Sequence, residues 1–411
     1  MKILLATYWA VPHLGGVWPY MLQLKEKLES LNHEVDLLGY GDEAGSYVNL
    51  VNKNQRINTD KLLPLLKSIL NPSDYPEIYM NKLIEYTEFR RYLFELSTAY
   101  FGLESYDVIH TQDVISTISI NRIRPPKAAL VASLHGSVAH EIRLQLENIH
   151  KSPTSYMARK YYDQLEYAGA SSAEYTVVAN QWMKKILTDE FHVPSEKIEV
   201  FQYGYDADNF SHLLTKESEI KRPANKKVIM YSGRLVQVKG VEYLLDALGQ
   251  LKEERQDWIC WIAGEGDKLA ELRLQCKVLG LEEDVIFLGN RNDIPSLLAQ
   301  ADIFVLPSII ENQPLSIIEA QLAGKAIIAS DVGGLPEMIE HKVTGLLTPA
   351  EDIECLCKYL SKLLRKDSLR NRLGSAAKDW GLSHWSLDNA VNHTVEVYEK
   401  AITERRRSFN D

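Results

Sequence analysis

Short apolar runs alternate with amphipathic stretches along most of the chain. In the first half, the apolar runs that predict buried strands are Ile3–Thr7, Val35–Leu38, Val108–His110, Ala129–Leu134 and Thr176–Ala179. A helix is expected over Trp18–Leu31, between the first two strands. Alternation of this kind is typical of a parallel sheet whose strands are joined by crossover helices.

The same rhythm restarts near Lys226. The expected strands are Val228–Ser232, Trp258–Ala263, Val285–Leu288, Ile303–Pro307, Ala326–Ser330 and Gly345–Leu347. The expected helices are Val241–Leu251, Asp267–Leu279, Ile294–Gln300 and Leu315–Leu322, with further helices to the C-terminus. The pattern predicts two doubly wound α/β domains in tandem. Lys216–Lys227, a charged stretch that contains Pro223, is the expected linker.

Residues 60–105 interrupt this alternation. Lys61–Leu70 and Asn81–Phe101 are expected to be helical, with Pro72 and Pro76 between them. Such an insertion either shapes an acceptor pocket or membrane contact, or adds a packed helical layer. The segment mixes acidic and basic residues instead of presenting a basic face, which favours the packed layer.

Composition excludes several classes of protein. The chain has 411 residues, of which 45% are hydrophobic, so two well-packed domains are expected. No stretch approaches the roughly 18–20 apolar residues of a membrane-spanning helix. The net charge of −10 argues against a general nucleic-acid binder. The four cysteines form no Cys-x-x-Cys pair, so we expect reduced thiols, no zinc site and a cytoplasmic protein.

Candidate chemistry gathers in loops that follow the expected strands, where open α/β sheets bind ligands. Gly15 and Gly16 precede the first helix and would let an anion approach its amides, although such a pair is as often a tight turn. Arg234 and Lys239, five residues apart in a glycine-flanked loop, would clamp a diphosphate. The alternative is a pair of solvated surface cations. The loop Gly264–Gly266 is suited to close approach of a ligand.

Two glutamates frame the start of an expected helix. Glu311 lies in the preceding loop, and Glu319 lies about one turn inside the helix. Between them, the amides of Leu315 and Ser316 form a positive helix N-terminus. This layout suits a sugar at Glu311, a phosphate at the amides and a ribose diol at Glu319. On spacing alone, Glu319 is equally well an ordinary helix carboxylate.

Two histidines follow strands of the first half. His135 ends a strand and precedes Gly136, which favours a functional role over that of a packed core residue. His110, followed by Asp113, gives a similar signal.

The order of these loops resembles the retaining glycosyltransferases of family 4, which have the GT-B fold. The resemblance covers nearly the whole chain. Its segments are Gly15-Gly16-Val17, Ser232-Gly233-Arg234-Leu235 with Lys239-Gly240, Ala263-Gly264-Glu265-Gly266, Phe287-Leu288-Gly289, Pro307-Ser308, Glu311 and Glu319, Asp331–Glu337 and Thr344–Leu347. Each segment is modest alone, but their order and spacing together are highly specific.

The resemblance implies an architecture. Two Rossmann-like, doubly wound parallel-sheet domains would face one another across a cleft. Residues 1–205 would bind the acceptor and carry the helical insertion of about 60–105. Residues 206–386 would bind the nucleotide sugar, and a helix over about 387–411 would pack back on the first domain. Tyr203–Asp206 would serve as the hinge.

The resemblance also implies roles for individual residues. Arg234 and Lys239 would neutralise the diphosphate leaving group in place of a divalent metal, so no metal or other cofactor is expected. Glu311 would contact the sugar hydroxyls, Glu319 would bind the ribose, and His135 would meet the sugar near its 6-hydroxyl. Further residues assigned to the nucleotide sugar are Gly15, Gly16, Gly233, Gly264, Glu265, Asn290, Arg291, Asn312, Gln313, Leu315 and Ser316. Asn290 and Arg291 would meet the nucleobase, whereas His110 and Asp113 are assigned to the acceptor.

Retention would place acceptor attack on the face from which the nucleotide leaves. The leaving phosphate itself would take the acceptor proton, so Glu311 is not assigned as a nucleophile. The expected partners are a nucleotide-sugar donor, with UDP as the expected nucleotide, and an acceptor that is a sugar, a small molecule or a glycan. No nucleic-acid partner is expected, and peripheral membrane contact and oligomeric state stay open.

Alternative activities and departures from the family pattern are few. A sugar-nucleotide epimerase or a glycan phosphorylase is possible on the same fold, as is a non-catalytic nucleotide-sugar-binding protein. The presence of Glu311, Arg234 and Lys239 argues against a non-catalytic protein, and no motif indicates the pyridoxal phosphate of a phosphorylase.

Family members often have Glu-Gly-Phe-Gly where this chain has Glu311-Asn-Gln-Pro314. That difference leaves the preferred sugar undetermined.

Overall fold

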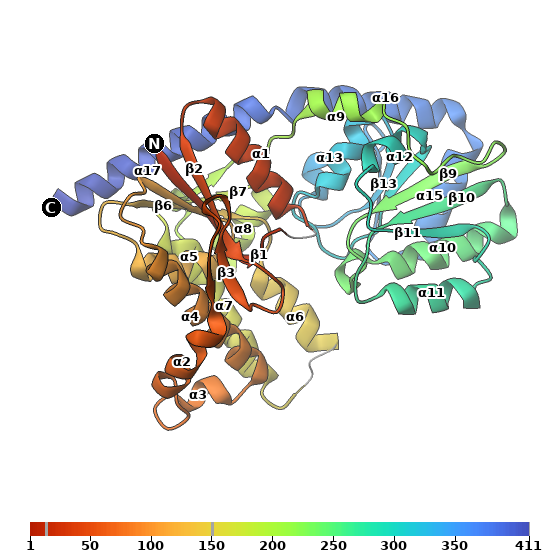
Figure 1. Ribbon diagram of the computed structural model, residues 1–411. Helices are drawn as coiled ribbons and strands as arrows, with labels where there is room; N and C mark the ends of the chain where they lie inside the picture. The colour runs from red at the N-terminus through yellow and green to blue at the C-terminus, as the bar shows by residue number, and fades with distance from the viewer. Residues whose placement is uncertain (13–14, 149–151, 411) are drawn as a thin grey trace. The chain divides into compact units, whose positions relative to one another are not determined.

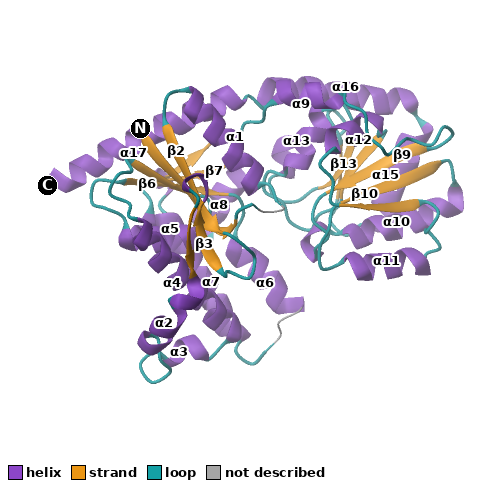
Figure 2. Cartoon of the chain, in the orientation of Figure 1, coloured by secondary structure: helices purple, strands orange, loops and turns teal. Residues whose placement is uncertain are grey.

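The computed structural model describes residues 1–12, 15–148 and 152–410, and it divides into two compact units. Unit 1 comprises Met1–Gln202 and Asp388–Asp411, and unit 2 comprises Tyr203–Leu387. Each unit contains a sheet with helices packed against it (Figures 1 and 2). Both sheets have a parallel core, as the alternating pattern predicts.

The sheet of unit 1 has the strand order β4-β3-β2-β1-β5-β6-β7-β8. Its strands are β1 (Lys2–Ala10), β2 (Glu34–Tyr40), β3 (Tyr47–Leu50), β4 (Gln55–Asn58), β5 (Val108–Thr111), β6 (Ala129–Leu134), β7 (Tyr175–Val178) and β8 (Ile198–Val200). The pairing is parallel from β2 through β1 to β8, and β3 and β4 add an antiparallel edge. The sequence did not predict this edge, because β4 is polar and mostly exposed, whereas the central strands are continuous apolar runs.

The helices of unit 1 cover this sheet and build the insertion. They are α1 (Val17–Ser30), α2 (Leu63–Ile69), α3 (Pro76–Tyr79), α4 (Lys82–Phe101), α5 (Val114–Ile123), α6 (Val138–Asn148), α7 (Ser155–Ser172), α8 (Gln181–Asp189) and α17 (Leu387–Asn410). The insertion consists of α2, α3 and α4, which share a small hydrophobic cluster of Leu66, Leu70, Ile78 and Leu93. This cluster supports the packed-layer interpretation of the insertion, while Leu65 on α2 stays 55% exposed.

Buried polar contacts hold α17 in unit 1. The two ring nitrogens of His110, on β5, lie 2.7 Å from Tyr398 Oη of α17 and 2.7 Å from Ser133 Oγ of β6. His110 and Tyr398 are both 0% exposed. At the surface, Lys400 pairs with Glu199 at 2.9 Å. The C-terminal helix is therefore an integral part of the unit that the N-terminal half builds.

The sheet of unit 2 is entirely parallel, with the order β11-β10-β9-β12-β13-β14. Its strands are β9 (Lys227–Ser232), β10 (Trp258–Ala263), β11 (Val285–Gly289), β12 (Ile303–Leu306), β13 (Ala326–Ser330) and β14 (Leu346–Thr348). Its helices are α9 (Ala207–Leu214), α10 (Val241–Glu254), α11 (Leu269–Val278), α12 (Ile294–Gln300), α13 (Leu315–Leu322), α14 (Leu335–Met338), α15 (Ile353–Arg365) and α16 (Asp367–His384). The strand predictions for this half are confirmed to within one or two residues at each end.

The prediction that Lys216–Lys227 is a linker is wrong. Ser218 is buried and donates a hydrogen bond to Asp293 at 2.7 Å, and Arg222 pairs with Asp302 at 2.9 Å. The charges and the proline that suggested a solvated linker therefore belong to a segment fastened to unit 2. The chain instead enters unit 2 at Tyr203.

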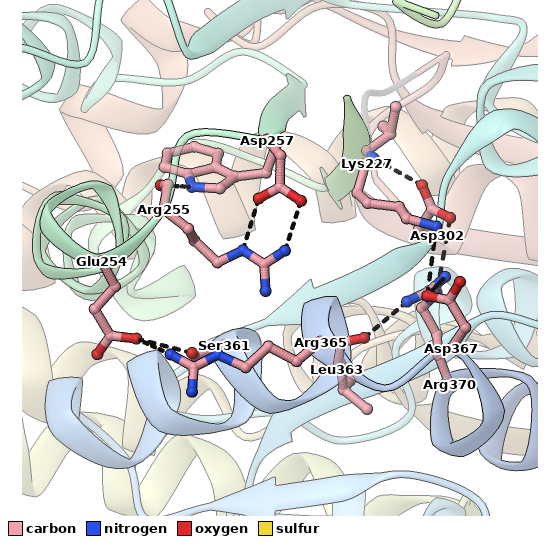
Figure 3. Close-up of polar contacts among 12 residues, drawn as sticks. Lys227, Glu254, Arg255, Asp257, Asp302, Ser361, Leu363, Arg365, Asp367 and Arg370 are labelled. Atoms are coloured by element: carbon pink, nitrogen blue, oxygen red, sulfur yellow. Dashed lines mark hydrogen bonds and ion pairs between the residues drawn. The ribbon is translucent and has the colours of Figure 1, made fainter. Parts of the chain in front are cut away.

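Charged side chains gather at the amino-terminal ends of the unit 2 strands, as Figure 3 shows. Asp302, just before β12, accepts a hydrogen bond from Val228 N at 2.8 Å and lies 3.7 Å from Arg370 of α16. Arg370 also pairs with Asp367, and Asp257, just before β10, pairs with Arg255. Because parallel strands share one direction, these ion pairs all lie at the edge opposite the carboxyl-end loops.

We expect Tyr398→Phe to lower the free energy of unfolding of unit 1 by about 1–2 kcal/mol, because a buried ring nitrogen of His110 loses its partner. Lys400→Ala removes only a half-exposed ion pair and is the matched control on the same helix, with an expected cost within about 0.5 kcal/mol. Thermal unfolding with hydrogen–deuterium exchange of β5 and α17 measures both. Equal costs for the two variants would contradict a buried anchor at Tyr398.

Candidate functional site

The loops after β9 and β10 touch through their backbones. Gly264 has a φ of +140°, and a Cβ there would lie 1.9 Å from the Gly233 carbonyl oxygen. A Cβ on Gly266 would lie 2.2 Å from the Leu235 carbonyl oxygen, and Leu235 N donates to the Glu265 carbonyl at 2.8 Å. Only glycine fits at these contacts. The predicted donor-binding residues Gly233, Gly264 and Glu265 therefore share one platform at the carboxyl edge of the sheet.

Arg234 projects from this platform. Its carbonyl oxygen accepts a hydrogen bond from the buried Tyr231 hydroxyl at 2.8 Å, which fixes the backbone. The residue is exposed, and its guanidinium makes no hydrogen bond or ion pair within the described parts of the chain. The loop thus holds the backbone firmly and presents the cationic head to solvent.

Lys239 and Glu311 form an ion pair between the loops after β9 and β12. Lys239 Nζ lies 2.5 Å from Glu311 Oε1, and Ser308 Oγ donates to the same oxygen at 2.8 Å. Both charged side chains are largely enclosed, with exposed fractions of 16% and 7%. Gly240, next to the lysine, has a φ of +60°, and a Cβ there would lie 2.2 Å from the Pro307 carbonyl oxygen. Two of the three N–H donors of the lysine stay uncommitted to Glu311.

The loop after β13 fixes the backbone of Glu311. Gly334 N donates to the Glu311 carbonyl at 3.1 Å. Gly333 has a φ of +59°, and a Cβ there would lie 1.8 Å from that same carbonyl oxygen. The glycine pair after Asp331 is therefore a close-approach turn that supports Glu311.

Helix α13 begins at Leu315, as predicted, and Glu319 lies about one turn inside it. The amides of Leu315 and Ser316 donate to no group within the described residues, and Pro314 supplies no side-chain cap. Glu319 accepts a hydrogen bond from Tyr205 Oη at 2.8 Å. Burial raises the pKa of the Glu319 carboxyl to about 7, against the lowering effect of Tyr205. The helix start is suited to an anion, and Glu319 to hydroxyl groups.

Two predicted donor-binding side chains have partners inside unit 2. The amide of Gln313 pairs with the backbone of Tyr203, with both hydrogen bonds 3.3 Å long. Arg291 donates two hydrogen bonds to the carboxylate of Asp293, 2.8 and 2.7 Å long. These hydrogen bonds raise the pKa of the guanidinium above its usual value. Both contacts are structural. Direct roles of these two side chains toward a nucleotide sugar stay predictions.

Three further predicted residues of unit 2 differ in exposure. Asn312 is buried next to Glu311, whereas Asn290 and Glu265 are exposed at the carboxyl edge of the sheet. Exposure at this edge leaves both side chains accessible to a ligand.

The corresponding edge of unit 1 holds His135 directly after β6. Its Nε2 lies 2.9 Å from Gln112 Oε1, and its ring meets the Tyr20 ring edge-on with centroids 4.9 Å apart. Burial lowers the pKa of His135 to about 3, so the ring is neutral at physiological pH. The loop before α1 places Gly15 and Gly16 at the same edge, with Gly16 as the N-cap; His13 and Leu14 lie outside the described residues.

The structure corrects the assignments of His110 and Asp113 to an acceptor. His110 is fully enclosed, and both of its ring nitrogens are hydrogen-bonded to protein side chains. Asp113 caps α5 through Ser116 N at 2.7 Å and accepts hydrogen bonds from Thr7 Oγ1 and Tyr8 N. A strand end followed by a helix start attracts such polar residues for structural reasons, which is why the sequence signal misled here.

Three residues of these loops were given no role from the sequence: Gln112, Ser308 and Tyr205. Gln112 follows β5 directly and Ser308 lies two residues after β12, but neither residue type carries an obvious chemical signal. Tyr205 lies in the segment expected only to be a hinge. Within the described ranges, no group of three or more His, Cys, Asp or Glu side chains is placed to hold a metal ion.

Comparisons with known proteins identify relatives along most of the chain. The family model described as glycosyl transferases group 1 matches residues 215–380, and the model of glycosyltransferase family 4 matches residues 14–209. A glycosyltransferase of Methanocaldococcus jannaschii is 25% identical over 98% of this chain and 99% of its own. An MMP alpha-(1->4)-mannosyltransferase of Mycolicibacterium hassiacum is 26% identical over 98% of both chains.

Solved structures share the fold. Sucrose-phosphate synthase from Thermosynechococcus elongatus superimposes with a TM-score of 0.74 at 18% identity, covering 98% of this chain and all of the other. The Anabaena protein Alr3699/HepE in complex with UDP-glucose gives a TM-score of 0.71 at 20% identity, covering 97% of this chain and all of the other. The shared fold and the two family models together define a GT-B glycosyltransferase. The chain belongs to glycosyltransferase family 4.

Gly333→Ala is expected to destabilise unit 2 by roughly 3 kcal/mol, because left-handed backbone strain adds to a clash with the Glu311 carbonyl. Gly280→Ala is the matched control, since its φ is +64° but the added methyl group would have no atom within 4 Å. The control is expected to cost about 1 kcal/mol. Denaturant unfolding measures both variants, and similar midpoints would refute the close approach at Gly333.

Tyr205→Phe is expected to raise the pKa of Glu319 above its value of about 7, because the phenol hydrogen bond favours the carboxylate. Folding therefore favours the protonated acid, and this contribution to stability is lost as pH rises through the folded pKa. A ¹³C NMR titration of the glutamate carboxyls measures the shift, with Glu319→Gln identifying the resonance. An unchanged or lower pKa in Tyr205→Phe would contradict the assigned contact.

Proposed function

We propose that the protein transfers a hexose or N-acetylhexosamine from a nucleotide sugar to an acceptor hydroxyl, with retention at the anomeric carbon. The observation that carries this proposal is the set of groups around Glu311. Arg234, Lys239 and the amides at the start of α13 form a cationic and hydrogen-bonding surface on loops of one unit. Such a surface suits a diphosphate leaving group.

UDP is the proposed nucleotide. The Anabaena structure contains UDP-glucose, and the name of an Escherichia coli relative, 26% identical over 72% of this chain, specifies UDP-Gal. Glu319 supports the binding of a ribose diol, because it lies about one turn inside the helix whose start would hold the phosphates. The names of the relatives span galactosyl and mannosyl transfer, so the proposal leaves the sugar itself open.

Charge stabilisation of the leaving group would supply much of the catalysis, without a metal ion. Arg234 offers a planar fork for phosphate oxygens, and Lys239 offers the N–H donors that Glu311 does not occupy. Glu311 itself accepts hydrogen bonds from Lys239 and Ser308, which suits it to orient sugar hydroxyls and not to act as a nucleophile. The leaving phosphate would take the acceptor proton.

Unit 1 is proposed to bind the acceptor, a sugar, a small molecule or a glycan. The sequence pair Arg90-Arg91 would suggest a basic surface for an anionic membrane, but the structure commits both side chains. Arg91 pairs with Glu88 and Glu95, and Arg90 lies over the rings of Tyr8, Tyr40 and Tyr86. No helix within the described residues is long and apolar enough to cross a membrane.

Arg234→Ala and Lys239→Ala are each expected to lower kcat/KM for sugar transfer at least about tenfold, on the order of 1.4 kcal/mol of transition-state stabilisation. Arg273→Ala removes the same charge from the exposed face of α11 and is the control for net charge alone. Initial rates with a saturating acceptor measure all three. Near-normal rates in both site variants would refute the diphosphate clamp.

The proposed function is tested by calorimetric and thermal-shift titration with UDP, GDP, ADP and their common sugars, with magnesium and with EDTA. We expect UDP and its sugars to stabilise the protein equally in both conditions, since ligand bound to the native state raises the unfolding temperature. A requirement for magnesium would reject the metal-free clamp. Turnover without any acceptor would favour an epimerase, and no stabilisation by any nucleotide would favour a non-catalytic role.

A further inference from the structure

Gln112 lies in the loop after β5 and reaches His135 in the loop after β6. Its side chain is 1% exposed, and its backbone N donates to the Ala6 carbonyl of β1 at 2.9 Å. Its Oε1 lies 2.9 Å from His135 Nε2. A buried amide thus joins three neighbouring strands of the unit 1 sheet at the edge where ligands bind.

The partners of Gln112 settle which way its amide points. Its Nε2 lies 3.3 Å from the His110 carbonyl oxygen, which can only accept a hydrogen bond. The amide oxygen is therefore directed at His135 and can only accept as well. It follows that His135 Nε2 carries the proton and that Nδ1 is the unprotonated nitrogen of the neutral ring.

We propose that Gln112 is a positioning residue that fixes both the tautomer and the ring orientation of His135. The role of His135 near the sugar is the one that the family resemblance implies, and it rests on the proposed function, whereas the tautomer does not depend on it. A histidine held in this way has its donor nitrogen and its acceptor nitrogen in fixed directions. Polar partners of this kind orient functional imidazoles in other sites, where their removal costs tenfold or more.

The groups around the ring agree with a neutral imidazole. Tyr20 of α1 packs edge-on against it, and burial raises the pKa of this phenol to about 12. His110 of β5 is neutral too, because burial lowers its pKa to about 3. An amide in place of a carboxylate at position 112 orients the ring without stabilising its charged form. Glutamine therefore suits a hydrogen-bonding histidine, and glutamate would suit a general base.

The competing explanation is that Gln112 only fastens its own loop to the sheet. Both explanations predict some loss of stability when the side chain is changed. They differ in the protonation of His135, because a merely structural amide has no influence on which imidazole nitrogen carries the proton. Nitrogen NMR of the histidine ring therefore separates them, independently of catalytic activity.

The experiment compares the wild-type protein of residues 1–411 with Gln112→Met, Gln112→Glu and Thr176→Val. The last removes a buried side-chain hydrogen bond on β7 that does not involve His135, and it controls for general destabilisation. Long-range ¹H–¹⁵N spectra report the tautomer, and His135→Asn identifies the resonances. Melting curves confirm that each variant is folded.

In the wild type and in Thr176→Val we expect one neutral tautomer with the proton on Nε2. Gln112→Met is expected to give a mixture of tautomers and to lower kcat/KM for transfer about tenfold to a hundredfold. Gln112→Glu, which is isosteric, is expected to raise the pKa of His135, so that the doubly protonated ring appears at higher pH than in the wild type.

A proton on Nδ1 in the wild type overturns the proposal, and so does an unchanged ¹⁵N spectrum in both Gln112 variants. If the predicted spectral changes appear but no nucleotide sugar binds or reacts, the positioning of His135 stands and the proposed function fails. If transfer activity is present and the spectra do not change, the proposed function stands and the positioning of His135 by Gln112 fails. Should Gln112→Met fail to fold, the isosteric Gln112→Glu carries the test alone.

Discussion

The ion pair between Lys239 and Glu311 is the contact around which the loops of unit 2 are arranged. It joins the loop after β9 to the loop after β12, and Ser308 and Gly334 hydrogen-bond to the same glutamate, through its carboxylate and its carbonyl. A largely enclosed lysine without a partner would be costly, and the pair removes that cost before any substrate arrives. The glycines of these loops follow from this arrangement, because the backbones must approach closely enough for the side chains to meet.

At the carboxyl edge of the unit 1 sheet, hydrogen bonds between neutral side chains join neighbouring loops and strands. Besides Asp113, which caps α5, this edge carries histidines, a glutamine, a serine and tyrosines that are joined through buried hydrogen bonds at His110, Gln112 and Ser133. Burial keeps both histidines uncharged, so the network needs no counter-ion. This edge therefore presents neutral hydrogen-bonding groups, whereas the unit 2 edge presents the charged pair of Lys239 and Glu311.

The sequence predicted the parallel strands well because buried strands are uninterrupted apolar runs flanked by turn residues. Trp258–Ala263 and Ala326–Ser330 were predicted at their observed bounds for this reason. The antiparallel edge of β3 and β4 was missed because polar, exposed strands resemble loops in sequence. The linker prediction was wrong because the charged residues and the proline suggested solvent exposure. The sequence alone does not reveal that Ser218 binds Asp293 and that Arg222 pairs with Asp302.

The residues of the candidate site also differ in how far the sequence alone could indicate them. Candidate residues that stand out through their chemical type and loop position, such as Arg234 and Glu319, could be proposed from the sequence. Residues that act by contact were not: Gln112, Ser308 and Tyr205 become visible only when their distances to His135, Glu311 and Glu319 are known. The same limit explains the error at His110, whose position at a strand end was correct but whose enclosure by Tyr398 of a distant helix no local pattern reveals.

The pairing of Lys239 also has a consequence for how the charge at the site is distributed. Lys239 and Glu311 cancel one another, so before a donor binds, the positive field comes from Arg234 and the amides of α13. In the proposed function a diphosphate would bring more negative charge than one carboxylate, and the N–H donors of the lysine that Glu311 does not occupy would let the lysine serve both at once. In the proposed reaction the glutamate would hold the lysine head in place while the phosphate leaves, so stabilisation of the leaving group would require no rearrangement of the loops.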